Sequence, residues 1–169
     1  LEVTISNGSL KLINVVQLDN YIAGVVESES GNWRSPEYYK VQAVLARTYT
    51  LSNLRRHELE GFHLCDKVHC QAYKRKSTQD YIVKAVDGSK GLVVVDSELD
   101  LITAAYHSNC GGHTVNSEHV WSLPTSYLKG MKDTFCLKEP NATWVKRISV
   151  QKWLSFLRRG YAYSSGDSL

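Results

Sequence analysis

Three histidines and two cysteines lie within positions 57–70, directly after a long amphipathic segment. Thiolates and imidazoles are the ligands that zinc prefers, and zinc closes loops that lack a hydrophobic core of their own. We therefore predict a tetrahedral zinc site here, with ligands His57, Cys65, His69 and Cys70. The sequence leaves open His63 in place of His57 as the fourth ligand, a disulfide between the two cysteines, and reduced thiols without metal.

The composition indicates a single globular domain over residues 1–169. With 43% hydrophobic residues, the chain can bury one core. Its net charge of +3 is spread over 20 basic and 17 acidic residues, which argues against a nucleic-acid-binding face. There is no signal-peptide pattern and no apolar run of roughly eighteen residues, the length a membrane span needs. We expect a soluble chain. Its first residues are compatible with the removal of a preceding signal or anchor segment.

Apolar periodicity and turn signals predict a mixed α+β fold. Asn7-Gly8 is typical of a hairpin turn, so two strands are expected on either side of it, within 3–16. Ser35-Pro36 is a strong helix start and predicts one long central helix to about Arg56. The other expected elements are a helix 19–26 with a turn at 28–32, a helix 78–86, strands 92–95, 101–106 and 144–148, and a helix 149–158. The tail, about 161–169, is expected to be poorly ordered.

Glu29 stands in the expected turn, just before the long helix. A carboxyl held there against a cleft suits a general acid, because partial desolvation would raise its pKa toward the working pH. The alternative is an exposed turn glutamate without a catalytic role. Glu27 is equally plausible on chemical grounds.

A second polar cluster follows an expected strand, at Tyr106-His-Ser-Asn-Cys-Gly-Gly-His-Thr114. Its two glycines are expected where backbone approaches a ligand closely. Cys110 or Ser108 could act as a nucleophile with His107 or His113 as base. The alternative is a tight glycine turn after a strand.

Two features of the sequence allow structural as well as functional interpretations. Cys110 and Cys136 could form a disulfide or stay as buried free thiols. Arg47, on the long helix, could meet a carboxylate or a carbohydrate, or lie on the surface.

Four ordered segments together resemble the domain of stage II sporulation protein D, a peptidoglycan lytic transglycosylase family that includes amidase enhancers. The segments are Tyr21-Ile-Ala-Gly-Val-Val-Glu-Ser-Glu29, Tyr39 to Tyr49 with its Ala-Arg-Thr-Tyr run, His57 to Tyr73, and Tyr106 to Thr114 followed by Val120-Trp121 and Tyr127-Leu128. Together they cover most of residues 10–135.

The resemblance implies cleavage of the β-1,4 bond between N-acetylmuramic acid and N-acetylglucosamine, with a 1,6-anhydro product instead of hydrolysis. It places Glu29, not Glu27, on the family's catalytic glutamate. Zinc on four protein ligands would be structural, whereas with only three a catalytic zinc becomes possible. The residues implied to hold the glycan are Arg47, Gln71, Tyr73, Tyr106, His107, Ser108, Gly111 and Gly112.

The resemblance also implies partners and a location. Peptidoglycan strands are the expected ligand, a cell-wall amidase is a possible partner, and the expected location is extracytoplasmic. Two positions depart from the family pattern: Ser30-Gly31 replaces the residues common after the glutamate, and His63 stands where an aspartate is usual. The loop change keeps a second function open, that of a non-catalytic glycan-binding module that recruits or stimulates an amidase. A thiol-dependent hydrolase using Cys110 is a third.

Overall fold

A computed structural model describes residues 1–6, 8–31, 34–139 and 141–160. The chain consists of two compact units, 1–106 and 107–169, called here the first and the second unit. The predicted α+β class is confirmed, because helices are combined with a small two-stranded sheet. The single domain stays a prediction, and the prediction for the tail lies outside the described residues.

The first unit begins with the predicted hairpin. Strands β1 (Glu2–Ser6) and β2 (Ser9–Ile13) pair antiparallel, with Ile5 opposite Leu10. Gly8 has a φ of 74°, the left-handed conformation that the turn requires. The predicted turn residue Asn7 lies outside the described residues. The second strand ends three residues before the predicted limit at 16, and the paired apolar side chains stay exposed.

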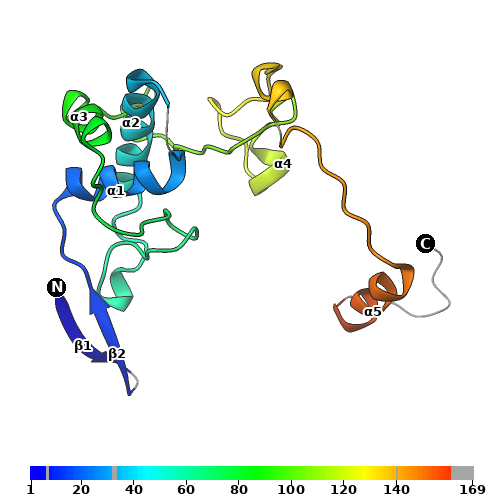
Figure 1. Cartoon of the computed structure of the whole chain (residues 1–169), viewed down its shortest axis with the longest axis horizontal. Helices are drawn as coiled ribbons and strands as arrows, with labels where there is room; N and C mark the ends of the chain where they lie inside the picture. Colours follow the sequence, from blue (N-terminus) through cyan, green and yellow to red (C-terminus); the bar gives the residue numbers. More distant parts are fainter. Residues whose placement is uncertain (7, 32–33, 140, 161–169) are drawn as a thin grey trace. The chain divides into compact units, whose positions relative to one another are not determined.

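Three helices build the core of the first unit: α1 (Leu18–Ser30), α2 (Pro36–Ser52) and α3 (Asp80–Gly88). Figure 1 shows them gathered beside one another, with α1 crossing the other two. Each contributes apolar side chains that are removed from water, which is the main source of stability for such a unit. The buried members are Ile22, Ala23, Val25, Val26, Tyr39, Ala43, Ala46, Ile82, Ala85 and Val86.

Helix α1 differs from its prediction in a way that matters for the site. It continues to Ser30, whereas a turn was predicted from Ser28. The Ser28 hydroxyl donates to the Gly24 carbonyl at 2.8 Å, so its side chain bonds within the helix, and Ser30 is buried. Gly31, with a φ of 65°, follows the helix. Glu29 therefore stands on the last helical turn and not in a loop.

The other helix predictions are close. Ser35 caps α2 as predicted, its hydroxyl accepting the Tyr38 N–H at 3.3 Å, although α2 ends at Ser52 instead of about Arg56. Helix α3 starts two residues later than predicted and ends at Gly88. None of the described helices is long and apolar enough to span a bilayer.

The second unit holds α4 (Glu118–Trp121), the short 3₁₀ helix η2 (Phe135–Lys138) and α5 (Val150–Gly160). The predicted terminal helix is confirmed as α5. Ser149 precedes it as predicted, with its hydroxyl accepting the Lys152 N–H at 3.3 Å. The strand predicted at 144–148 is wrong, since the described residues there are in no strand.

The strands predicted at 92–95 and 101–106 are reduced to one isolated bridge, Val95 with Leu101. Helix α2 accounts for part of the difference, because its side chains bind this segment. The Val94 N–H donates to the Thr48 hydroxyl at 3.0 Å, and the Leu92 carbonyl accepts from Arg47 at 3.1 Å. Backbone groups that bind side chains in this way are not available for hydrogen bonds between strands.

Candidate active site and metal centre

The predicted metal ligands converge in the first unit. Beyond α2 the chain passes through His57 and the 3₁₀ helix η1 (Glu58–Glu60), then returns through Cys65, His69 and Cys70. One ligand atom from each of the four side chains lies within 4.8 Å of the other three. His63 is exposed and is not part of this group, so the geometry favours His57 as the fourth ligand.

The spacing of these atoms fits one tetrahedral ion. In a site with zinc–sulfur and zinc–nitrogen bonds of roughly 2.3 and 2.0 Å, neighbouring ligand atoms lie about 3.5 Å apart. Cys70 Sγ is 3.4 Å from His57 Nε2 and 3.6 Å from His69 Nδ1, and Cys65 Sγ is 3.7 Å from His69 Nδ1. The donor set, two sulfurs and two imidazole nitrogens, is therefore one that could hold a metal ion.

Electrostatics in the cluster also suit a cation. Burial by itself raises the pKa of the Cys65 thiol, but hydrogen bonds at the Lys67 backbone and with neighbouring ligand side chains lower it to about 6. Cys65 is thus largely a thiolate at neutral pH, the form that binds metal. The carboxylate of Glu60 contacts His57 Nδ1, which leaves Nε2 to face Cys70. A carboxylate behind a histidine ligand fixes the ring and strengthens it as a donor.

The last turns of α1 hold the chain segment that follows the metal ligands. The Ala72 N–H donates to Glu29 Oε1 at 2.7 Å, and the Lys74 N–H donates to the Ser28 hydroxyl at 3.3 Å. The Thr78 N–H donates to Glu27 Oε2 at 3.2 Å. Residues 72–78 are thereby aligned along the end of α1, and Ala72 follows Cys70 by two positions.

The two candidate glutamates have different surroundings. Glu27 is only 16% exposed and lies 3.6 Å from the Arg75 guanidinium, so its charge is already partnered. Glu29 is exposed, with one oxygen fixed by the Ala72 N–H. This geometry supports Glu29 as the acid–base candidate, because only an accessible carboxyl can exchange a proton with a ligand.

Tyr106, at the end of the first unit, lies beside Glu29. Its side chain is 37% exposed. Burial, and then the negative charge of Glu29, raise the pKa of Tyr106 to about 12. The hydroxyl is therefore protonated at neutral pH and is a hydrogen-bond donor next to the carboxylate.

Gln71 is placed differently from its prediction as a glycan contact. Its side chain is only 1% exposed. Its Oε1 accepts from the Thr50 hydroxyl at 2.8 Å and the Tyr21 hydroxyl at 3.4 Å, while Nε2 donates to the Ala46 carbonyl at 3.2 Å. Gln71 thus holds the loop of the Cys/His cluster against α2, and its side chain lies beneath the surface of the candidate site.

Tyr73 is half-buried and packs against α1. Its ring stacks on Tyr21 with centroids 5.0 Å apart. The pair lies against Gly24, where an added Cβ would approach the Tyr73 ring to 2.5 Å and the Arg75 carbonyl to 2.3 Å. Only glycine fits at this crossing, and Tyr73 keeps part of its surface available to a ligand.

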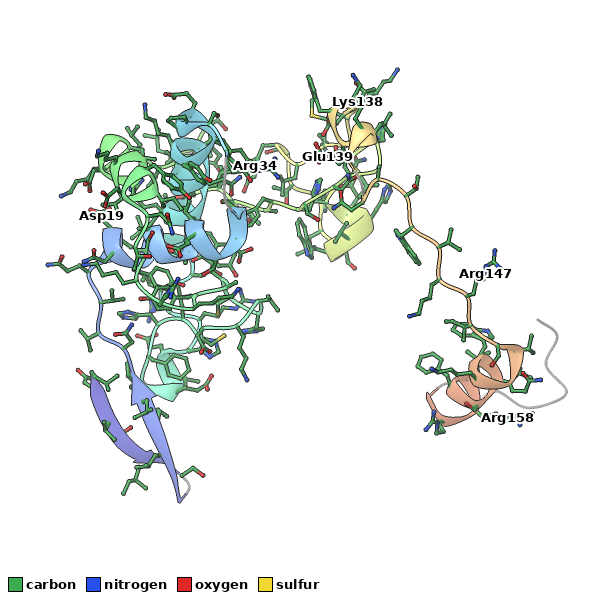
Figure 2. All side chains as sticks on the ribbon, in the orientation of Figure 1. Asp19, Arg34, Lys138, Glu139, Arg147 and Arg158 are labelled. Atoms are coloured by element: carbon green, nitrogen blue, oxygen red, sulfur yellow. The ribbon has the colours of Figure 1, made fainter. Side chains whose placement is uncertain are left out.

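Arg47 does not fit the predicted role of a glycan contact. It is 2% exposed, and its guanidinium donates to the carbonyls of Ser89 at 2.9 Å and Leu92 at 3.1 Å. It also pairs at 3.4 Å with Asp19, labelled on α1 in Figure 2. Arg47 therefore joins α1, α2 and the end of α3, and we correct its assignment to a structural one.

The remaining predicted glycan contacts are in the second unit: His107, Ser108, Gly111 and Gly112. Both glycines have positive φ, 68° and 99°. An added Cβ at Gly112 would approach Leu137 Cδ2 to 2.8 Å, so this turn also requires glycine. Their role as glycan contacts stays a prediction.

Cys110 is an unfavourable nucleophile in this structure. Burial raises the pKa of its thiol. A hydrogen bond at the Gly112 backbone lowers it, but hydrogen bonds with Cys136 and Asp133 raise it further, and the net shift is upward. A thiol with a raised pKa is mostly protonated at neutral pH, and the thiolate is the reactive form. This environment argues against a thiol-dependent hydrolase.

The sequence interpretation missed three contacts at the candidate sites. The backbone N–H of Ala72 carries no side-chain signal and could not be identified from residue type. Glu60 was identifiable, since it lies three residues from His57 across a short helical turn. Asp133, which contacts both Cys110 and Cys136, carries a signal in its Asp-x-x-Cys spacing.

The sequence matches one family model and several known proteins. The family described as stage II sporulation protein matches residues 6–95. The chain is 36% identical over 131 residues to the amidase enhancer of Bacillus subtilis (strain 168), covering 78% of this chain and 17% of that protein. It is 30% identical over 154 residues to stage II sporulation protein D of Bacillus amyloliquefaciens, covering 82% of this chain and 44% of that protein. The chain thus spans less than half the length of these two relatives.

Proposed function

This chain belongs to the stage II sporulation protein D family, and we propose that it is a lytic transglycosylase that cleaves peptidoglycan. The observation that carries the proposal is the exposed carboxylate of Glu29, oriented by the Ala72 N–H and adjacent to the protonated hydroxyl of Tyr106. The proposed substrate is the β-1,4 bond between N-acetylmuramic acid and N-acetylglucosamine. Such a substrate implies an extracytoplasmic location.

In the proposed mechanism, Glu29 performs both proton transfers. Its carboxyl group protonates the glycosidic oxygen as the bond to the anomeric carbon of muramic acid breaks. The resulting carboxylate then takes the proton of the muramic acid 6-hydroxyl, whose oxygen closes onto the anomeric carbon. The product is a 1,6-anhydro sugar, no water is consumed, and Glu29 returns to its protonated form. A second carboxylate, which hydrolytic glycosidases need, is not required.

Other residues of the first unit would orient the reacting groups. The Ala72 N–H fixes one oxygen of Glu29, so the second oxygen has a defined direction. Tyr106 would donate a hydrogen bond to the carboxylate or to a sugar oxygen. We further propose Tyr73 of the first unit as a glycan contact. For the second unit, we propose His107, Ser108, Gly111 and Gly112 as glycan contacts.

We propose that the metal of the Cys/His cluster is zinc and that it is structural. The fit of two thiolates and two imidazoles to tetrahedral spacing supports zinc, and four protein ligands leave no open position for water. The ion would hold Cys70, and through it Ala72, against the end of α1. No proton-transfer step involves it.

Replacement of Glu29 tests the mechanism. We expect Glu29→Gln to lower the release of 1,6-anhydro products from purified peptidoglycan on the order of 10²-fold or more, because the amide cannot donate the proton. Mass spectrometry of the soluble products measures the release of 1,6-anhydro sugars. Glu27→Gln is the matched control and should retain activity, since Glu27 is already paired with Arg75. Retained activity in Glu29→Gln, with loss in Glu27→Gln, would reverse the assignment.

The identity to an amidase enhancer favours a second candidate function. In this alternative the chain binds peptidoglycan without cleaving it and stimulates a cell-wall amidase. Co-sedimentation with peptidoglycan, together with the rate of a purified amidase, tests it. Binding and stimulation that persist in both wild type and Glu29→Gln, without anhydro products from either, would favour this function over the first.

A further inference from the structure

The second unit has a weak hydrophobic interior. Among its described residues, 107–139 and 141–160, the single buried side chain is that of Ser117, and no apolar side chain is buried. Large apolar groups such as Phe135, at 90% exposure, lie at the surface instead. Small units without a sufficient core are commonly stabilised by cross-links or metal ions. The unit therefore needs another source of order.

Three side chains of the second unit that can bind a metal ion lie close together. Ligand atoms of Cys110, Asp133 and Cys136 all lie within 4.8 Å of one another. Asp133 Oδ2 is 3.4 Å from Cys110 Sγ and 3.5 Å from Cys136 Sγ. Neighbouring sulfur and oxygen ligands of a tetrahedral zinc ion lie about 3.5 Å apart. The two cysteines are free thiols.

The backbone around this group is fixed independently of any ion. The Asp133 N–H donates to the Gly112 carbonyl at 3.0 Å, and Asn109 Nδ2 donates to the Cys136 carbonyl at 3.0 Å. The Gly111 N–H donates to Asn109 Oδ1 at 2.7 Å. These bonds hold the glycine turn against the start of η2, so the three donors are prearranged.

The spacing of two of the donors in the sequence also supports a metal site. Asp133-x-x-Cys136 is a pair with the short separation that structural zinc sites use. His107, three positions before Cys110, is exposed, and its ring nitrogens do not belong to the group of three ligand atoms. The three donors therefore leave one tetrahedral position for a ligand from outside this group.

We propose that Cys110, Asp133 and Cys136 form a second zinc site that stabilises the second unit. Both thiols lose their protons to solvent when the ion binds, and neither sulfur is oxidised. The ion fastens the Gly111-Gly112 turn to η2. This site is separate from the Cys/His cluster of the first unit and does not depend on the proposed enzymatic activity.

Zinc stoichiometry of the full chain tests the proposal. The protein is purified with a thiol reductant, loaded with zinc, freed of excess ion and weighed by native mass spectrometry. We expect two zinc ions in wild type, one in Cys136→Ser and one in Cys70→Ser, which disables the first site. Phe135→Ala is the matched control, because its side chain is 90% exposed and offers no ligand atom, and it should keep two ions.

A conservative variant separates loss of the site from loss of folding. Asp133→Asn preserves shape but removes the charge, and we expect at least a tenfold weaker second zinc ion with an unchanged circular dichroism spectrum. One zinc ion in wild type that disappears in Cys70→Ser would overturn the proposal. So would a peptide bridging Cys110 and Cys136 by a disulfide in zinc-loaded protein, since a disulfide consumes both thiolate ligands.

Discussion

Glu29 and Tyr106 divide the chemistry of the candidate site between two side chains. The pKa of Tyr106 is raised to about 12 by burial and by the charge of Glu29. A hydroxyl with this pKa donates hydrogen bonds at neutral pH but does not give up its proton. In the proposed mechanism the carboxylate of Glu29 therefore carries out the proton transfers, and Tyr106 has a positioning role.

Removal of the Tyr106 hydroxyl should slow turnover without abolishing it. We expect Tyr106→Phe to reduce the rate of anhydro-product release about 10- to 100-fold, because a hydrogen bond to a charged group contributes roughly 1.5–3 kcal/mol. Steady-state kinetics on solubilised glycan strands measures the change. Tyr38→Phe, on the outer side of α2, is the control. Equal rates in wild type and Tyr106→Phe would contradict the positioning role.

The raised pKa of Tyr106 also predicts a pH dependence of stability. Below pH 10.0, its ordinary pKa, the hydroxyl is protonated in both the folded and the unfolded chain. Between pH 10 and about 12 the unfolded chain loses this proton first, so unfolding becomes easier as the pH rises. Denaturant titrations across this range should show a smaller decline for Tyr106→Phe than for wild type. An identical decline in both proteins would contradict the environment described for Tyr106.

The end of α1 and the segment 72–78 form the element that carries the site. Three side chains of α1 accept backbone N–H groups from this segment. Tyr73 crosses the helix over Gly24, which has no room for a side chain. The closeness of this crossing sets the distance between Glu29 and its partners.

A methyl group at position 24 should separate α1 from this segment. We expect Gly24→Ala to destabilise the chain by about 1–3 kcal/mol, the usual cost of overpacking, and to lower activity as well. Chemical denaturation measures the loss. Gly88→Ala is a suitable control, because the nearest atom to its added Cβ is the flexible Lys40 Cε at 3.6 Å. Equal stability of the two variants would show that the crossing is not tight.

The buried guanidinium of Arg47 provides a second test at this scale. We expect Arg47→Ala to cost about 3 kcal/mol or more, because it leaves several buried carbonyl groups without a donor. Arg55→Ala, which removes an exposed ion pair with Glu58, should cost less than about 1 kcal/mol. Thermal unfolding of the two variants measures both losses of stability. Weakened glycan binding by Arg47→Ala at full stability would restore the original assignment.

The sequence predicted elements better than it predicted contacts. Ser35-Pro36 and Asn7-Gly8 act through local backbone preferences, so the long helix and the hairpin could be predicted. The ligands His57, Cys65, His69 and Cys70 are close in sequence and of distinctive chemistry, so they could be identified as well. The burial of Arg47 and Gln71 could not be predicted, because a polar residue type gives no signal in the sequence that its side chain is buried. The extra turn of α1 depends on tertiary contacts of Ser30 and Glu29, which local sequence does not encode.

On the scale of the whole molecule, the two units obtain their order from different sources. The first has a core of buried apolar side chains shared by three helices. The loop of the Cys/His cluster extends from this core and has few buried apolar groups of its own. Its order should therefore depend on the ion.

Removal of metal should loosen that loop before it unfolds the core. We expect a chelator to increase amide hydrogen exchange over residues 57–73 while residues 82–86 in α3 stay protected. Product release should fall in parallel, because Ala72 would no longer orient Glu29. Hydrogen exchange with mass spectrometry measures both regions in one experiment. Unchanged exchange over 57–73 after complete zinc removal would contradict a structural ion there.

The position of Glu29 on the last turn of α1 has a further consequence for how this family can diversify. The backbone that carries this carboxylate moves only when the packed helix moves. Insertions or substitutions in the surrounding loops would then reshape the proposed sugar-binding surface while the proposed proton donor keeps its place. Selectivity for different glycan strands would thereby evolve separately from the proposed bond cleavage.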